Sequence, residues 1–397
     1  MKLLSISTVV PYDKIGHAGG KTYNFYMKKT AQDAEIDLQI MAFSKRDDLY
    51  KYDLDLYHIK NDIILSSGSI ITNIKRVMYD LKGKRTKYGY FFSNYKKQII
   101  LNKLFALKKS GNFPDIIQLE WTEMVLLAKD IRKYFPKVKI IASEHDVSFL
   151  KEKRNLEYEP NNLKLRKRYE WMKNMELESL ESVDCIMPQC FKDKKLLIEN
   201  GICEDRIFVL TPYFHDMSYI IREKINKDIL FWGAMYRPEN YEAAIWFIEN
   251  VMPRVKDLEI RFVVVGNRPP QALKKYSSDK VIITGYVQDE TSFFESSMCF
   301  VSPLLTGAGV KVKVIEALSA GIPILTNDIG IEGIPATNGQ NYYHCEKPEE
   351  YEKIIRKIYY GQFNKEEFEC SQRKLITDFY NLENSIKEYK DMLKSLT

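Results

Sequence analysis

The sequence lacks the cysteine pattern of a disulfide-rich or zinc-binding protein. Its 397 residues include six cysteines, with no CxxC pair and no histidine nearby at metal-ligand spacing. We therefore expect reduced thiols, no metal and a cytoplasmic location. The six are Cys185, Cys190, Cys203, Cys299, Cys345 and Cys370.

Long apolar runs are also missing. A segment that spans a bilayer needs about 18 to 20 apolar residues, and the candidates here are strand-sized, such as residues 262–265. The opening MKLLSISTVVPYDKIG has no basic start, long apolar centre or small-residue cleavage site of a secretory signal. We expect no export, and membrane contact only as a peripheral protein at the inner face of the cell membrane.

Length and composition indicate two globular domains. The chain is 45% apolar and 29% charged, which excludes disordered and fibrous classes, and 397 residues are too many for one core. Two domains imply a cleft between them. We expect an acceptor-binding domain at residues 1–215, a sugar-donor domain at 216–375, and a final helix, 376–397, that packs back on the first domain.

Short β-branched runs alternate with helix-length segments, which predicts an α/β fold of two Rossmann-like, doubly wound parallel sheets. Helices are expected at 23–34, 123–134, 161–182, 191–200 and 366–393. Strands are expected at 3–9, 37–42, 116–119, 138–142, 185–188 and 207–210 in the first half, and at 228–232, 260–265, 281–284, 298–302 and 323–326 in the second.

Positive charge is concentrated in the first half. Residues 1–200 carry a net charge of +10 within a chain total of +6, and residues 71–110 hold eleven basic side chains against Asp80. Aromatic residues interleave with these lysines, as in segments that contact anionic membranes. A solvated helical face is the alternative, and the lack of a known nucleic-acid module argues against nucleic acid.

The strongest motif is PLLTGAGVKVKVIEALSAGIPIL, residues 303–325. A strand end, a loop with Gly307 and Gly309, and a helix that opens near Val310 would aim free backbone N–H groups at a phosphate. Lys311 and Lys313 would add positive charge for a diphosphate. Within the same run, Glu316 can accept hydrogen bonds from two ribose hydroxyls.

This run resembles the sugar-donor motif of the retaining glycosyltransferase family 4, the group 1 glycosyltransferases, which have the GT-B fold of two facing Rossmann-like domains. The resemblance implies that Glu316 holds the ribose. GAMYRPEN, residues 233–240, resembles the loop where a basic residue meets the diphosphate, which implies roles for Gly233, Arg237 and Asn240. VVVGNR, residues 263–268, resembles a loop beside the nucleobase and includes Gly266; VIITGYV, residues 281–287, resembles the next strand end.

Two positions depart from the family pattern. Many members carry an acidic residue eight positions before the ribose glutamate, but Ala308 stands there, which leaves sugar recognition open. Asn240 stands near the place of an expected lysine, and Lys311 or Lys313 would supply the missing charge.

The first half supplies further candidates. The Gly19-Gly20 pair lets a backbone approach a phosphate or sugar closely, although such a pair also serves as an ordinary turn. His145 follows a strand at a carboxyl edge, and the resemblance implies contact with the donor sugar; a structural histidine is the alternative. Glu120, Trp121 and Asp146 are candidate acceptor contacts.

The resemblance implies transfer of a sugar from a nucleoside-diphosphate sugar to a hydroxyl of a glycan acceptor, with a lipid-linked acceptor of surface polysaccharide assembly as our hypothesis. Arg237, Lys313 and His145 would assist catalysis, with retained configuration and no metal or cofactor. An inverting enzyme and a non-catalytic sugar-nucleotide-binding scaffold stay open. A nicotinamide dehydrogenase is disfavoured because GxGxxG is missing.

Overall fold

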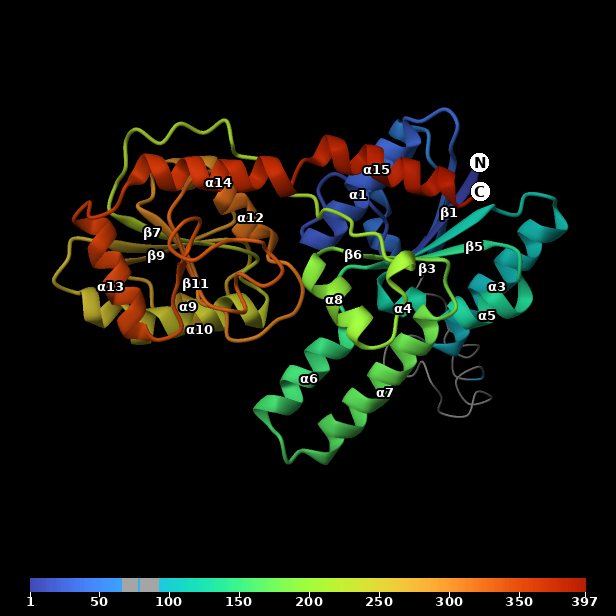
Figure 1. Ribbon diagram of the computed structural model, residues 1–397, viewed down its shortest axis with the longest axis horizontal. Helices are drawn as coiled ribbons and strands as arrows, with labels where there is room; N and C mark the ends of the chain where they lie inside the picture. The colour runs from blue at the N-terminus through green and yellow to red at the C-terminus, as the bar shows by residue number, and fades with distance from the viewer. Residues whose placement is uncertain (66–77, 79–92) are drawn as a thin grey trace. The chain divides into compact units, whose positions relative to one another are not determined.

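The computed structural model describes residues 1–65, 78 and 93–397, and it divides the chain into two compact units (Figure 1). Unit 1 contains Met1–Thr211 together with Glu383–Thr397, and unit 2 contains Pro212–Leu382. Each unit is built on a six-stranded parallel sheet.

The sheet of unit 1 has the strand order β3-β2-β1-β4-β5-β6. Its strands are apolar on both faces, which is expected because helices cover both sides of a parallel sheet. They are β1 (Lys2–Ser7), β2 (Asp37–Ser44), β3 (Lys60–Leu65), β4 (Ile116–Glu120), β5 (Lys139–Glu144) and β6 (Cys185–Pro188).

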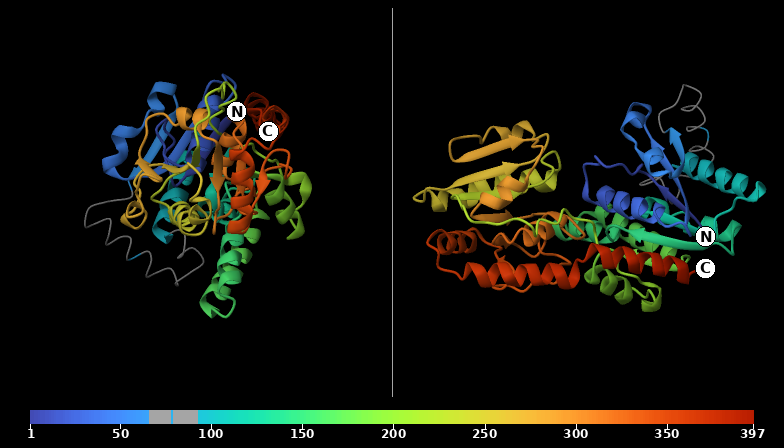
Figure 2. Two further views of the ribbon diagram at one scale, coloured as in Figure 1. Left: turned by 90° about the vertical axis from the view of Figure 1, so that its left-hand side faces the viewer. Right: turned by 90° about the horizontal axis from the view of Figure 1, so that it is seen from above.

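Two layers of helices cover this sheet. On one face lie α1 (Ala18–Ala31) and α15 (Leu382–Ser395), which share a core (Figures 1 and 2). In this core the ring centres of Tyr26 and Tyr389 are 5.2 Å apart. A second core of the unit contains buried residues of six other described helices. These are α3 (Asn94–Lys109), α4 (Trp121–Val125), α5 (Ala128–Tyr134), α6 (Ser148–Tyr158), α7 (Leu163–Leu180) and α8 (Phe191–Glu199).

The sheet of unit 2 repeats the same topology in the order β12-β11-β10-β7-β8-β9. Its strands are β7 (Asp228–Trp232), β8 (Arg261–Val265), β9 (Val281–Gly285), β10 (Cys299–Ser302), β11 (Ile324–Thr326) and β12 (Tyr343–His344). Its helices are α9 (Pro238–Asn250), α10 (Gln271–Lys274), α11 (Thr291–Ser296), α12 (Val312–Ser319), α13 (Pro348–Tyr359) and α14 (Lys365–Phe379).

Both units have the Rossmann strand order, which confirms the predicted fold class. In such sheets the order reverses between two central strands, here β1 and β4 in unit 1 and β7 and β10 in unit 2. Ligands bind beyond the carboxyl ends of the strands at this reversal. We therefore expect the ligand-binding residues in the loops that follow these four strands.

Several sequence expectations are wrong in detail. The segment 207–210 forms an isolated bridge from Ile207 to Ile186 and is not a strand, and the edge strands β3 and β12 were missed. The expected helix 366–393 is two helices, because α14 ends at Phe379 and Tyr380 turns inward against Phe214.

Candidate functional site

In unit 2 the glycine loop and the helix after β10 stand at the sheet reversal. Gly307 and Gly309 have φ angles of 131° and 70°, which favour glycine, and α12 begins at Val312 rather than near Val310. Lys311 caps the helix, donates to Gly309 O and lies 3.6 Å from the buried Glu332 carboxylate. The side chain of Lys311, which was expected to bind a phosphate, therefore holds the glycine loop through these contacts.

Lys313 is the second residue of α12. Its ammonium donates to Asn240 Oδ1 at 2.8 Å and lies 4.5 Å from the centre of the Phe231 ring. Burial, together with the positive charge of Lys311, lowers the pKa of Lys313 to about 7. A diphosphate next to this amine would favour its charged form.

Glu316 occupies the middle of α12, and its side chain is buried. One carboxylate oxygen accepts from the His215 backbone N–H at 3.3 Å, and the other accepts from Trp232 Nε1 at 3.1 Å. Trp232 was not among the residues predicted from the sequence, although it is the last residue of β7 and directly precedes Gly233. This carboxylate is therefore held in a fixed orientation at the sheet reversal.

The loops after β7 and β8 meet with little space between them. A Cβ atom on Gly266, whose φ is 153°, would lie 1.7 Å from Gly233 O, and one on Gly233 would lie 3.2 Å from the Asn240 amide. Asn240 also donates to Ala234 O at 2.9 Å. Gly233, Gly266 and Asn240 are thus brought together with Lys313, and the glycines permit the close backbone approach.

Arg237 lies at the start of α9 and is exposed. Its guanidinium forms an ion pair with Glu239 in the first turn of this helix. Val310 is half-buried in the loop before α12.

In unit 1 the candidates after β4 and β5 form one cluster. His145 Nε2 lies 3.0 Å from Glu120 Oε2, and Gln189 donates from Nε2 to His145 Nδ1 at 2.7 Å. Trp121 stacks on the imidazole with ring centres 4.3 Å apart, and its own φ is 62°, in the left-handed region that non-glycine residues rarely adopt. In this arrangement His145 accepts at Nδ1 and donates its Nε2–H to Glu120.

The same cluster extends through residues that the sequence analysis missed. Gln118 donates to the other oxygen of Glu120 at 2.5 Å and accepts from Tyr389 at 2.7 Å. Burial and the Glu120 charge raise the pKa of Tyr389 well above its usual range. Gln118 and Tyr389 are separated by 271 positions in the chain, so no local sequence pattern could connect them.

The two glycines after β1 have different surroundings. They lie in the first turn of α1, which begins at Ala18, so the expected helix start at residue 23 was wrong. A Cβ on Gly19 would contact His145 at 3.1 Å, whereas one on Gly20 would lie 2.3 Å from Ile15 Cδ1. Gly19 thus belongs to the His145 cluster, and Gly20 is required by internal packing.

Acidic side chains surround the His145 cluster. Asp146 is half-buried, and burial together with its charge raises the pKa of Glu123. Burial raises the pKa of Glu144 well above its usual range and that of Glu176 to about 8. Glu176 also accepts from the backbone N–H groups of Ser148 and Phe149, each at 2.9 Å.

One metal-ligand grouping occurs among the described residues. Asp328, His344 and Glu346 are near the β11–β12 edge, with ligand atoms within 4.8 Å of one another, and both carboxylates are exposed. Within residues 1–65, 78 and 93–397, no helix is long and apolar enough to cross a bilayer.

The comparisons with known structures agree on the fold over the whole chain. Sucrose-phosphate synthase from Thermosynechococcus elongatus aligns with a TM-score of 0.68 at 12% identity, covering 100% of this chain and 99% of that one. Anabaena HepE in complex with UDP aligns with a TM-score of 0.67 at 10% identity. The lipopolysaccharide outer core galactosyltransferase WaaB aligns with a TM-score of 0.65 at 14% identity. Both alignments cover 100% of each chain. The fold is GT-B.

Sequence comparison assigns the family of unit 2. Residues 226–360 match the family described as glycosyl transferases group 1, and this stretch is a group 1 glycosyltransferase domain. The chain is also 27% identical over 164 residues to an uncharacterized 44.6 kDa protein in the cps region of Klebsiella pneumoniae. That alignment covers 37% of this chain and 42% of the relative. The match to the family model supports a transferase activity.

Proposed function

We propose that the protein transfers a sugar from a nucleoside-diphosphate sugar to a hydroxyl group of a glycan acceptor, with retention of configuration. The observation that carries this proposal is the oriented carboxylate of Glu316 on α12, the helix that follows the glycine loop at the sheet reversal of unit 2. A carboxylate in this orientation can accept from the two vicinal hydroxyls of a ribose. The Anabaena HepE structures with UDP and with UDP-glucose support this class of ligand.

The charged groups near Glu316 suit a departing diphosphate. As the bond between sugar and phosphate breaks, negative charge develops on the leaving group, and preorganised positive charge stabilises it most effectively. Lys313, Lys311 and the amino-terminal end of α12 supply such charge in our proposal, with Arg237 as an exposed contributor. The reaction would then need no metal, and we expect turnover to be unchanged by EDTA.

The acceptor is proposed to bind unit 1, through Glu120, Trp121 and Asp146. A glycan of surface polysaccharide assembly fits the relative from a cps region, and a lipid link would fit the basic stretch 71–110. Residues 71–77 and 79–92 of that stretch lie outside the described residues. Cosedimentation with vesicles that contain anionic lipid, compared with neutral vesicles and at two salt concentrations, tests the membrane contact at a cytoplasmic surface.

Binding measurements test the central proposal. UDP, GDP, ADP and their glucose or mannose conjugates are titrated calorimetrically into the wild type and Glu316→Ala. We expect one nucleobase to bind selectively, and the substitution to weaken that binding by about 1.5 to 3 kcal/mol, the range for a hydrogen bond to a charged group. The absence of binding by any of these compounds would contradict the proposal.

The contact between Glu120 and His145 favours a second candidate, an inverting transferase. A buried carboxylate can orient and support an imidazole base, and Nδ1 of His145 would take the proton of the acceptor hydroxyl in place of its hydrogen bond from Gln189. Nuclear magnetic resonance of the anomeric proton in the product separates the two mechanisms. An inverted product together with complete loss of turnover in His145→Ala would establish the second candidate.

A further inference from the structure

The Glu316 carboxylate accepts a hydrogen bond from a side chain outside its own helix. Trp232 is half-buried at the end of β7, and its indole N–H donates to Glu316 Oε2 at 3.1 Å. The other oxygen accepts from the backbone of His215. Because each oxygen accepts from a protein donor, the orientation of the carboxylate is set on both sides.

An indole is well suited to position a carboxylate that must bind a sugar. It is a donor only, so it does not compete with the carboxylate for hydroxyl protons, and it is neutral, so the negative charge of Glu316 is retained. Each carboxylate oxygen can accept two hydrogen bonds. An oxygen that accepts from Trp232 can therefore also accept from a ribose hydroxyl.

We propose that Trp232 is a positioning residue for ribose recognition: it holds Glu316 so that the carboxylate distinguishes a ribonucleotide from a 2′-deoxyribonucleotide. This inference rests on the proposed function, because it assumes that Glu316 contacts the ribose of the sugar donor. It goes further, because it assigns the preference for ribose over deoxyribose to the hydrogen bond between Trp232 on β7 and Glu316 on α12.

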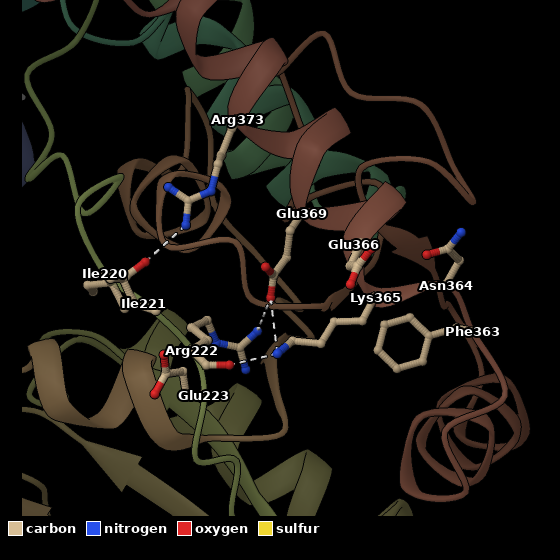
Figure 3. Close-up of a pocket in the computed structure, with 10 residues that line it drawn as sticks. All are labelled: Ile220, Ile221, Arg222, Glu223, Phe363, Asn364, Lys365, Glu366, Glu369 and Arg373. Carbon is tan, nitrogen blue, oxygen red and sulfur yellow. Dashed lines mark hydrogen bonds and ion pairs between the residues drawn. The ribbon is translucent and has the colours of Figure 1, made fainter.

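The helix that carries Glu316 is supported independently of Trp232. The segment after Thr211 runs along α12, where Met217 N donates to Ser319 Oγ at 2.9 Å and Arg222 donates to Gly321 O at 2.9 Å. Figure 3 shows Arg222 beside Glu369 and Lys365, in the wall of a cavity of about 560 Å³. Replacement of Trp232 should therefore release the carboxylate and leave the helix in place.

The test compares ribonucleotides with deoxyribonucleotides. UDP, GDP and ADP and the 2′-deoxy form of each are titrated calorimetrically into the wild type, Trp232→Phe and Trp246→Phe. Trp246 is the matched control, because it is partly buried in the same unit but packs against Tyr351. We expect the wild type to prefer the ribonucleotide by about tenfold or more, Trp232→Phe to reduce this ratio towards one, and Trp246→Phe to preserve it.

The outcomes separate this inference from the proposed function. If the wild type binds none of the six nucleotides, the proposed function fails and the inference fails with it. If the wild type binds and Glu316→Ala weakens binding, but Trp232→Phe keeps the wild-type ratio or loses both affinities equally, only the inference is overturned. If Trp232→Phe does not fold, Trp232→Tyr is measured against the same criterion.

Discussion

Lys313 on α12 donates a hydrogen bond to Asn240 Oδ1 on α9 at 2.8 Å. This bond places the ammonium group of one helix against the side-chain amide of the other. The Asn240 amide is itself fixed, since it donates to Ala234 O. The loop after β7 and the helix after β10 are therefore joined through a single amide.

Lys313 should make nucleotide binding depend on pH. Its pKa is lowered to about 7, so at pH 8.5 the amine of the free protein is mostly neutral, and a bound diphosphate should restore the charge. We expect binding at pH 8.5 to take up close to one proton, and affinity to fall by up to about tenfold per pH unit above pH 7. Calorimetry in buffers of different ionisation enthalpy measures this uptake.

Lys313→Met removes the titrating group and supplies the comparison. The variant should bind the nucleotide more weakly at pH 7 and lose the proton uptake. The exposed Lys274 on α10 provides the control, because Lys274→Met should retain the wild-type uptake. Equal uptake by the wild type and Lys313→Met would show that another group titrates.

Gly266 should be intolerant of a side chain. Its φ of 153° is unfavourable for other residues, and a Cβ atom would lie 1.7 Å from Gly233 O, where only backbone can move. We expect Gly266→Ala to destabilise the protein by more than about 4 kcal/mol or to prevent folding. Gly361 has a φ of 67° with open space around it, so Gly361→Ala should cost only about 1 to 2 kcal/mol of backbone strain. Urea unfolding measures both, and equal losses would refute the steric argument.

Much of the fold could be predicted because the parallel strands are apolar on both faces and are separated by helical segments. The run 228–232 was predicted with the bounds of β7. The strand β3 was missed because KNDIIL has polar residues in its first half and lies at the sheet edge, where burial does not select a pattern. The helix break after Phe379 escaped prediction because it depends on a tertiary contact of Tyr380.

The candidate sites could be predicted only where they are local in sequence. The glycine loop, Lys313 and Glu316 fall within one run of residues, so spacing alone brought them together. The partners of Glu316 lie 84 and 101 positions earlier in the chain, at Trp232 and His215. Such contacts follow from the sheet topology, and they cannot be predicted from the spacing of residues in the sequence.

The acidic pair Glu144 and Glu176 should make unit 1 less stable as the pH rises. Burial raises the pKa of Glu176 to about 8 and that of Glu144 well above its usual range, whereas both would ionise near pH 4.5 in the unfolded chain. The folded state therefore holds more protons between pH 4.5 and about 8, so stability is full below this window and is lost as the pH rises through it.

Glu144→Gln tests this pair. The carboxylate accepts from Thr122 Oγ1 at 3.0 Å, and a glutamine oxygen can accept the same hydrogen bond while it stays neutral at every pH. We expect the variant to lose less stability than the wild type between pH 5 and pH 8, measured by urea unfolding at each pH. The exposed Glu157→Gln is the control and should retain the wild-type slope. Equal slopes in all three proteins would exclude a role for Glu144.

Arg222 should be the side chain on which the stability of unit 2 depends most among its described arginines. It is buried, its guanidinium donates to Phe294 O, Gly321 O and Ser297 O, and it lies 3.6 Å from the Glu369 carboxylate. Arg222→Met would leave these buried acceptors without their donor, which should cost about 3 kcal/mol or more.

The comparison is Arg356→Met, which removes an arginine whose bonds to Asp257 and Glu352 are at the surface. Exposed ion pairs contribute little to stability, so this variant should unfold close to the wild type in a thermal scan. Because Arg222 holds the carboxyl end of α12 through Gly321 O, Arg222→Met should also weaken nucleotide binding when unit 2 is still folded. Loss of stability with full nucleotide affinity would show that α12 keeps Glu316 in place without this anchor.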